Sequence, residues 1–304
     1  MKFLLLGKDG QIGSELHHKL CSLGKVVALD FDSSDQCGDL TDLLGLAETV
    51  RTVRPTVIVN AAGHTAVDKA EGEPDLARLI NATAPGLLAQ EAEKLGAWLV
   101  HYSTDYVFDG GGDQPWAETD SPNPLNVYGK SKLEGDRLVA AHCTKHLIFR
   151  TSWVYAVHGE NFAKTMLCIG KERERLKVID DQIGAPTGAD LIADITCHAL
   201  RQVLPTLGNN PTAAGIYHVS AGGYISWYDY ACFVIETARN AGMKLKVRSQ
   251  DIDPISTSDY VTSTHRPKNS RLNTTLFQNT FGMELPHWQD GVTRMLTKII
   301  ENQS

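Results

Sequence analysis

Short apolar runs alternate with longer helical segments over the first half of the chain, and this alternation limits the possible folds most. The apolar runs are KFLLL (2–6), KVVAL (25–29), TVIVN (56–60), AWLVHYS (97–103) and HLIFR (146–150). The segments with helical periodicity between them are 11–24, 42–53, 74–96 and 128–143, the third interrupted near Pro85. Apolar strands that are separated by helices are typical of a parallel sheet covered on both faces. We therefore predict an α/β fold with a doubly wound parallel sheet.

This pattern changes after Arg150, which indicates a second part of the chain. Helices are expected at 161–174, 191–204, 227–242 and 287–300, and strands at 176–179 and 215–220. The stretch 250–273 is rich in loop residues, and we expect 204–215 to be a surface loop. We predict a first domain over residues 1–150 and a smaller α/β domain over residues 151–304, with some later segments returning to the first domain.

Charge and cysteine content argue against several classes of protein. The net charge is −7, and acidic and basic residues are mixed, so no basic stripe is available to follow a nucleic-acid backbone. No apolar run approaches the roughly 20 residues that cross a bilayer. The six cysteines show no CxxC pair, and the eleven histidines form no zinc motif. We expect free thiols, a cytoplasmic location, and neither nucleic acid nor membrane as a partner.

A glycine-rich loop, GKDGQIG, lies directly between the first predicted strand and the first predicted helix. Its glycines, Gly7, Gly10 and Gly13, allow a tight turn and a close approach of the backbone to a pyrophosphate at the helix N-terminus. Asp30 ends the second strand, where an acidic side chain can accept hydrogen bonds from an adenosine ribose. The competing interpretation is an ordinary turn and a solvated aspartate. The pattern predicts that residues 1–150 bind NAD(P).

The choice between NADH and NADPH stays open at this stage. The Asp30 carboxylate would repel a 2′-phosphate, but Lys8 in the neighbouring loop could offset that charge. Asp39 and Leu40 are placed to cover an adenine, and the segment NAAGHT (60–65) follows the third strand at the edge where ligands bind in such sheets.

A hydroxyl-bearing turn and a Tyr-x-x-x-Lys helix follow the fourth strand. The turn contains Ser103, Thr104 and Asp105, and Tyr128 and Lys132 are one helical turn apart, so both can face one side of a helix. A phenol can deliver a proton to a ketone while a nicotinamide delivers hydride, and an ammonium group nearby would lower the pKa of the phenol. The alternative is a surface helix with an unrelated Lys.

These motifs resemble those of a known family. GKDGQIG, STDYVF, YGKSK and RTSWVY are similar to the extended short-chain dehydrogenase/reductases that act on nucleotide sugars. HYSTDYVFDG, NFAKTML, DQIGAPTGAD and RPKNSRL most resemble the dTDP-4-dehydrorhamnose reductases among them. The resemblance implies a Rossmann-type fold and reduction of the C4 ketone of a dTDP-6-deoxy-hexulose by NADPH or NADH, the last step of dTDP-L-rhamnose formation for surface polysaccharides such as O-antigen.

The resemblance also implies roles for individual residues. Tyr128 would be the proton donor, Lys132 its partner and Thr104 the hydroxyl that tunes it. Residues implied at the substrate are Thr104, Asp105, Tyr128, Trp153 and, as a diphosphate contact that could equally be an ordinary ion pair, Arg266. Residues implied at the cofactor are Gly7, Gly10, Gln11, Ile12, Gly13, Asp30, Asp39, Leu40, Ala62, Gly63, His64, Thr65, Tyr128 and Lys132. The loop IGAPTG (183–188) and the segment HRPKNSRL (265–272) would lie near the nucleotide.

Some members of the family form homodimers that hold Mg²⁺ with interface carboxylates. Glu15 and Asp190 match those motif positions, so the resemblance implies a Mg²⁺ site and a homodimer. Asp190 is one carbon shorter than the glutamate often found there, and Mg²⁺ needs near-octahedral oxygen geometry. A helix-surface carboxylate is the alternative interpretation of each residue.

Two other functions remain possible from the sequence. A related epimerase or dehydratase would share the fold, but dehydratases carry a glutamate after Thr-Asp, and Tyr106 occupies that position here. A non-catalytic regulatory subunit also occurs in a homologous branch. The intact pair of Tyr128 and Lys132 argues against this alternative, because a binding module does not need a tuned phenol.

Overall fold

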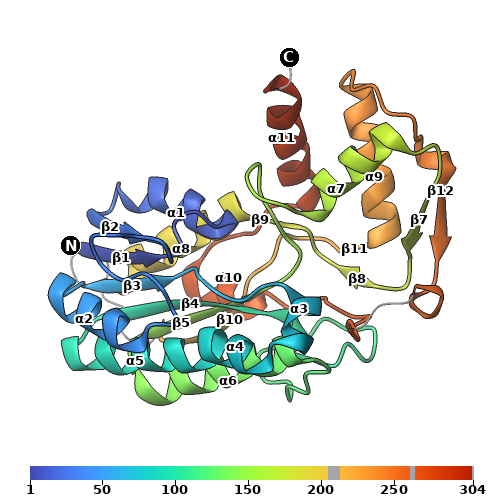
Figure 1. Ribbon diagram of the computed structural model, residues 1–304. Coiled ribbons are helices and arrows are strands. Elements are labelled where there is room, and N and C mark those ends of the chain that lie inside the picture. Colours follow the sequence, from blue (N-terminus) through green and yellow to red (C-terminus); the bar gives the residue numbers. More distant parts are fainter. Residues whose placement is uncertain (205–212, 261–263, 303–304) are drawn as a thin grey trace.

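The centre of the computed structural model is a six-stranded parallel sheet (Figure 1). The structure describes residues 1–204, 213–260 and 264–302. The strands are β1 (Lys2–Leu6), β2 (Lys25–Leu29), β3 (Val57–Asn60), β4 (Trp98–Thr104), β5 (His146–Thr151) and β10 (Gly215–His218). Their order is β10-β5-β4-β3-β1-β2, so the chain changes direction between β1 and β3. This confirms the predicted doubly wound Rossmann-type sheet, and ligands bind at such a switch point.

Helices cover both faces of the sheet (Figure 1). Helices α1 (Gln11–Leu20) and α8 (Ala189–Val203) pack together on one face. Helices α2 (Leu43–Val53), α5 (Ala84–Leu95) and α6 (Val127–His142) cover the other face. Side chains that alternate along β1 enter two separate apolar clusters, Phe3 and Leu5 on one side and Leu4 and Leu6 on the other. Burial on both faces explains why the strand is apolar throughout.

The third predicted helix is broken at the position that the sequence indicates. It consists of α4 (Pro74–Arg78), a π-helical turn (Leu79–Thr83) and α5, and Pro85 lies in the first turn of α5. Proline has no N–H to bond the carbonyl of Asn81, so the wider turn occurs just before it. The Asn81 carbonyl instead lies against α6, where a Cβ on Gly135 would be 2.1 Å from its oxygen.

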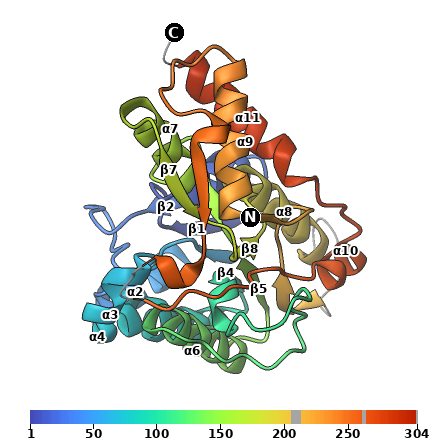
Figure 2. The same cartoon turned by 90° about the vertical axis from the view of Figure 1, so that its right-hand side faces the viewer.

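The second half of the chain forms a smaller set of helices and short strands beside the sheet (Figures 1 and 2). The helices of this set are α7 (Phe162–Glu172), α9 (Trp227–Asn240) and α11 (Trp288–Glu301), whereas α10 (Thr275–Phe281) packs against β10 and α8 of the central layers. The paired strands are β7 (Leu176–Ile179) with β12 (Ile252–Ile255), β8 (Ile183–Gly184) with β11 (Ile225–Ser226), and β6 (Val154–Tyr155) with β9 (Thr187–Gly188). Figure 2 shows β7 and β12 side by side.

The structure differs from the sequence prediction at a few elements. Strand β12 falls in the stretch predicted as loop, and α10 was not predicted. The predicted strand 215–220 is β10, and it extends the central sheet by pairing with β5. Most of the predicted surface loop 204–215 lies outside the described residues. The boundary between the two predicted domains at residue 150 stays a prediction.

Two further features are the state of the cysteines and the length of apolar helices. All six cysteines are free thiols, as the sequence predicts. Within the described part of the chain, no helix is both long enough and apolar enough to cross a membrane.

A buried carboxylate joins α2 to α5. Glu91 accepts hydrogen bonds from Arg51 at 2.8 and 2.6 Å and from Lys94 at 2.7 Å, and its side chain is 2% exposed. The hydrogen bond from Arg51, with further help from Lys94, lowers the pKa of Glu91 to about 2. A carboxyl group of this kind stabilises the fold while it is ionised.

Glu91→Gln is therefore expected to lower the free energy of unfolding by roughly 1–3 kcal/mol at pH 7, measured by urea denaturation. Because the folded pKa is lowered, the difference from wild type should be full above about pH 4.5 and should shrink as pH falls toward 2. Glu48→Gln, an exposed change on α2, is the control. Equal effects of both changes, or a difference that persists at low pH, would contradict this role.

Candidate active site

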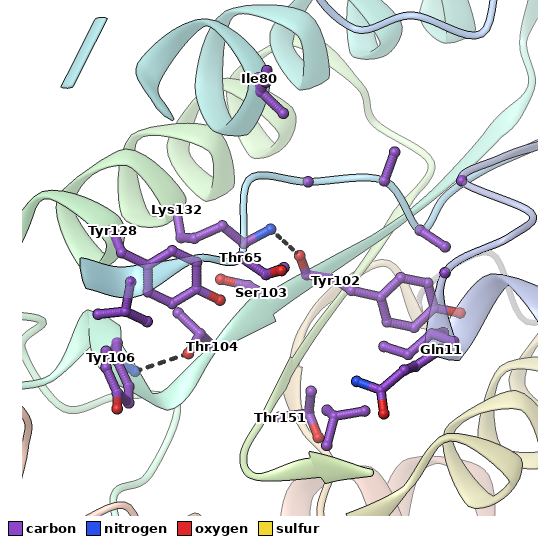
Figure 3. A pocket seen from close by; sticks show the side chains of 18 of the residues that line it. Gln11, Thr65, Ile80, Tyr102, Ser103, Thr104, Tyr106, Tyr128, Lys132 and Thr151 are labelled. Atoms are coloured by element: carbon purple, nitrogen blue, oxygen red, sulfur yellow. Dashed lines mark hydrogen bonds between the residues drawn. The ribbon is translucent and has the colours of Figure 1, made fainter. Parts of the chain in front are cut away.

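A cleft of about 770 Å³ lies at the carboxyl ends of the sheet strands (Figure 3). It collects residues from both halves of the chain, in agreement with the switch-point rule. The predicted residues that line it are Gly7, Gly10, Gln11, Ile12, Asp30, Asp39, Leu40, Ala62, Gly63, Thr65, Thr104, Asp105, Tyr128, Lys132 and Trp153. The glycine loop and the Tyr-Lys helix therefore face one cavity.

The glycine loop turns tightly between β1 and α1. Gly7 has φ +82°, and a Cβ there would lie 2.6 Å from the Ala62 nitrogen. A Cβ on Gly13 would lie 1.8 Å from the Gly7 carbonyl oxygen, so Gly13 allows the helix to pack on the loop although it does not line the cleft. Side chains at these two positions would clash with the backbone of the turn after β3 and of the loop itself, so glycine keeps the loop close to the N-terminus of α1. The backbone therefore fits a pyrophosphate group.

Asp30 lies at the end of β2 and also holds the glycine loop. Its carboxylate accepts hydrogen bonds from the backbone N–H of Asp9 at 3.0 Å and of Phe31 at 2.8 Å. Lys8 is paired with Asp9. This pairing raises the pKa of Lys8, and the charge of Asp30 raises it further by a smaller amount. The lysine charge is thus already partly matched by carboxylates. Further along the cleft, Asp39 accepts hydrogen bonds from Thr41.

The turn after β3 is held by Asn81 of the π-helical turn. The Asn81 side chain accepts a hydrogen bond from the His64 N–H at 2.8 Å and donates one to the His64 carbonyl at 3.0 Å. Its amide also donates to the Ser131 hydroxyl at 3.0 Å. This arrangement presents Gly63 and Thr65 to the cleft and directs the imidazole of His64 toward Glu73, 3.4 Å away. His64 itself does not line the cleft, and its role at the cofactor stays a prediction.

Tyr128 is the second residue of α6, and its side chain is partly buried. The helix starts at an Asn126 cap, whose side chain accepts from the Gly129 N–H at 2.8 Å. Gly129 allows close packing, because a Cβ there would lie 2.2 Å from the Tyr106 carbonyl oxygen. Figure 3 shows Tyr128 and Thr104 facing the same cavity, and the Thr104 hydroxyl acts to lower the pKa of Tyr128.

The pKa of Tyr128 differs from the sequence prediction. Burial raises it above its ordinary value, the hydrogen bond with Thr104 lowers it in part, and the charges of Asp105 and Asp136 raise it further. The predicted lowering of the Tyr128 pKa by Lys132 is not among these effects. The ammonium group of Lys132 donates to the Tyr102 carbonyl at 2.5 Å (Figure 3), and burial lowers the pKa of Lys132 to about 8.

Asp105 provides a carboxyl group at the floor of the cleft. It follows β4, is 2% exposed and accepts a hydrogen bond from Thr104 at 3.1 Å. Burial raises its pKa to about 6, against a lowering hydrogen bond from Ser270. Ser270 belongs to the predicted segment 265–272, which lies next to Asp105, although none of its residues lines the cleft; its place near the nucleotide stays a prediction. A carboxyl group in these surroundings can accept or donate a hydrogen bond near neutral pH.

An aromatic wall bounds the other side of the cleft. Trp153 and Trp227 are stacked with ring centroids 3.5 Å apart, and both line the cleft. Trp153 has φ +49°, a left-handed conformation that is costly for a residue with a side chain. Gly184, in the predicted loop 183–188, provides space for the indole, because a Cβ there would lie 2.5 Å from the ring.

Arg266 is not part of the cleft lining. Its guanidinium pairs with Asp68 at 2.6 Å, and its charge acts to lower the pKa of Tyr106. Since Tyr106 does line the cleft, Arg266 lies just behind the wall. The ion-pair alternative describes the structure, and contact with a diphosphate stays a prediction.

Glu15 and Asp190 lie in a second, small cleft together with Arg294 and Lys298. Arg294 lies 3.5 Å from Asp190 and satisfies part of its charge. Among residues 1–204, 213–260 and 264–302, no group of three or more His, Cys, Asp or Glu is placed to hold a metal. One chain thus supplies two carboxylates next to two cations, which does not make an octahedral Mg²⁺ site. The Mg²⁺ site stays a prediction.

Several lining residues were not predicted from the sequence. They are Phe31, Gly38, Val67, Ile80, Tyr102, Tyr106, Thr151, Ser152, Val154, Glu160 and Trp227. Thr151 and Ser152 directly follow β5, so the rule that ligands bind at carboxyl ends of strands could have found them. Trp227 and Glu160 are brought in by tertiary packing, for which the local sequence holds no signal.

The fold and the cleft together define the class of the protein. A glycine loop at the switch point of a Rossmann-type sheet lies in the same cleft as Tyr128, the buried Lys132 and a strand-end threonine. This is the arrangement of a short-chain dehydrogenase/reductase with an extended substrate-binding part.

Comparisons with known proteins identify the family. The family described as RmlD substrate binding domain matches residues 1–300, and the chain belongs to it. The chain is 56% identical to dTDP-4-dehydrorhamnose reductase of Escherichia coli K12 over 299 residues, 98% of each chain. Among solved structures, the same enzyme from Clostridium acetobutylicum matches with TM-score 0.88 and 34% identity over 99% of this chain and 100% of the other. The enzyme from Bacillus anthracis in complex with NADP matches with TM-score 0.87 and 32% identity over 98% and 99%.

Tyr128→Phe is expected to lower turnover by roughly 10²–10⁴-fold, because it removes the only proton that the ring can give. Binding of both ligands should change little, as measured by calorimetry. Tyr155→Phe, a buried tyrosine outside the large cleft, is the matched control. Wild-type turnover in the Tyr128 variant would rule out its role as the acid.

Asp30→Asn is expected to shift the preference toward NADPH by about tenfold, because it removes a negative charge from the ribose end while keeping an acceptor for the loop. The ratio of kcat/KM for the two cofactors measures this. Asp32→Asn removes an equal charge from a residue outside the cleft lining and serves as the control. An unchanged ratio in the Asp30 variant would show that this residue does not recognise the ribose.

Proposed function

We propose that the chain is an NAD(P)H-dependent dTDP-4-dehydrorhamnose reductase, which reduces the C4 ketone of dTDP-4-dehydro-L-rhamnose to give dTDP-L-rhamnose. One observation carries the proposal: the phenol of Tyr128 lies in the same cleft as the glycine loop, beside Thr104 and Lys132. The similarity to enzymes of this name over nearly the whole chain supports the choice of substrate.

The residues of the cleft account for the proton in this reaction. Bound NADPH or NADH supplies the hydride that forms the new C–H bond at C4. The Tyr128 hydroxyl gives its proton to the C4 oxygen, and the O–H bond that breaks leaves a phenolate. The Thr104 hydroxyl, which faces the same cavity as Tyr128, is placed to orient the phenol and the carbonyl oxygen. The ammonium group of Lys132 stabilises the phenolate that forms in the buried site.

The remaining groups bind the substrate. Asp105 offers a buried carboxyl group to the sugar hydroxyls, and Trp153 offers a flat apolar face. The indole of Trp153 is held by the Trp227 ring behind it, so it is a rigid surface.

Tyr106 distinguishes reduction from dehydration. Dehydratases need a carboxylate base at this position to remove a proton from carbon. Tyr106 is a phenol, its edge faces the ring of Tyr128 with centroids 5.7 Å apart, and burial raises its pKa above its ordinary value. It therefore stays protonated at neutral pH and cannot act as that base.

We also propose a homodimer in the cytoplasm, on the basis of the family resemblance. The free thiols of all six cysteines are in agreement with a reducing compartment.

The function is tested by incubating the chain with the dTDP-4-keto sugar and NADPH or NADH and identifying the product by NMR. The expected product carries a C4 hydroxyl of the L-rhamno configuration, formed with one equivalent of oxidised cofactor. No oxidation of either cofactor would favour the regulatory-subunit alternative. Tightly bound nicotinamide in the purified chain and a C4-epimerised product would favour an epimerase.

A further inference from the structure

Helix α6 carries a third buried polar residue in line with Tyr128 and Lys132. Asp136 follows Lys132 by one helical turn, so the three side chains occupy one face of the helix. Asp136 is 1% exposed and Lys132 is 5% exposed. Asp136 does not line the cleft. A carboxylate so deep in the protein needs a reason, because burial of a charge is costly.

Arg150 on β5 holds this carboxylate. Its guanidinium donates to Asp136 at 3.0 Å, and the two side chains are 3% and 1% exposed. The other oxygen of the carboxylate, Oδ1, is buried and has no hydrogen-bond partner among the described residues. Replacing such a buried pair by apolar residues is often neutral for stability, so stability alone does not explain it.

The surroundings of Lys132 give the reason. Its ammonium group donates to a neutral carbonyl, that of Tyr102, and burial acts against its charge. Among the described residues, the negative charge of Asp136 raises the pKa of Lys132 and so opposes the effect of burial. The other groups that face this region are Tyr128 on α6, His101 on β4, Asp105 after β4 and Arg150 on β5.

His101 does not compensate the lysine. It is buried at 1% exposure, and burial together with the charge of Lys132 lowers its pKa well below its ordinary value. It is therefore neutral at physiological pH and adds no competing charge. The field at Lys132 depends chiefly on Asp136, whose own orientation Arg150 fixes.

We propose that Asp136 is a positioning residue for the reduction: fixed by Arg150, its carboxylate keeps Lys132 in the charged form that stabilises the Tyr128 phenolate. This inference rests on the proposed reductase function and deepens it. Asp136 acts through Lys132 and touches neither substrate nor cofactor.

The test is the pH dependence of kcat in Asp136→Asn. Removing the carboxylate takes away a charge that favours protonated Lys132, so the alkaline limb of the profile should move to lower pH by about one unit. At pH values above the shifted alkaline limb, kcat should then be about tenfold lower than in wild type, while kcat near pH 6 should stay within a few-fold of wild type. A purely structural residue would lower turnover equally at every pH and leave the limb in place.

Three variants serve as comparisons. Asp136→Glu keeps the charge and should keep the wild-type limb. Glu134→Gln removes a carboxylate from the same helix, where it pairs with Arg78 at the surface, and should change nothing. If Asp136→Asn does not fold, the double variant Asp136→Asn/Arg150→Met leaves no unpaired buried charge and should show the same acid shift.

A direct measurement separates this inference from the proposed function. In protein labelled with 13C-lysine, the Cε signal of Lys132, assigned by its loss in Lys132→Arg, reports the pKa of the ammonium group without turnover. A pKa that is lower in the Asp136→Asn or the double variant than in wild type supports the inference even if no keto-sugar is reduced. An unchanged pKa, or an unmoved alkaline limb in an active variant, overturns it.

Discussion

The site depends on keeping one ammonium group charged inside the protein. Lys132 is buried, and it reaches β4 only because α6 lies very close to its neighbours. Two glycines make this approach possible, since a Cβ at Gly129 or Gly135 would lie 2.2 or 2.1 Å from a backbone oxygen of the adjacent segment. The helix that presents the phenol and the ammonium is therefore fixed by backbone contact on two sides. Preorganised charge of this kind needs no rearrangement during the reaction.

Much of this arrangement could be predicted from local sequence. The five apolar strands, the glycine loop and the Tyr-x-x-x-Lys helix each depend on spacing over a few residues, which the chain shows directly. The rule for ligand sites in parallel sheets then places these motifs at one edge. Pro85 also correctly predicts where the third helix is interrupted, because its missing N–H disturbs the turn before it.

The remainder could not be predicted because it depends on partners far apart in the chain. His64 turns its ring to Glu73 because Asn81 holds its backbone, and Arg266 meets Asp68 almost two hundred residues away. Strand β12 forms only against β7, and its own residues include a proline that disfavours a strand. The effect of burial on Tyr128 and Lys132 likewise comes from the folded interior. Spacing shows which groups can meet, whereas packing determines their charge.

The order in which the central sheet is completed has a consequence for synthesis. Strand β10 pairs with β5, and α8 covers α1, yet both come from the later half of the chain. While the ribosome adds residues 152–214, the outer edge of β5 exposes unpaired backbone groups. The hydrogen bonds at this edge of the central sheet therefore form only after β10 has been synthesised. Throughout that interval the open edge is the place where a neighbouring nascent chain can add a strand.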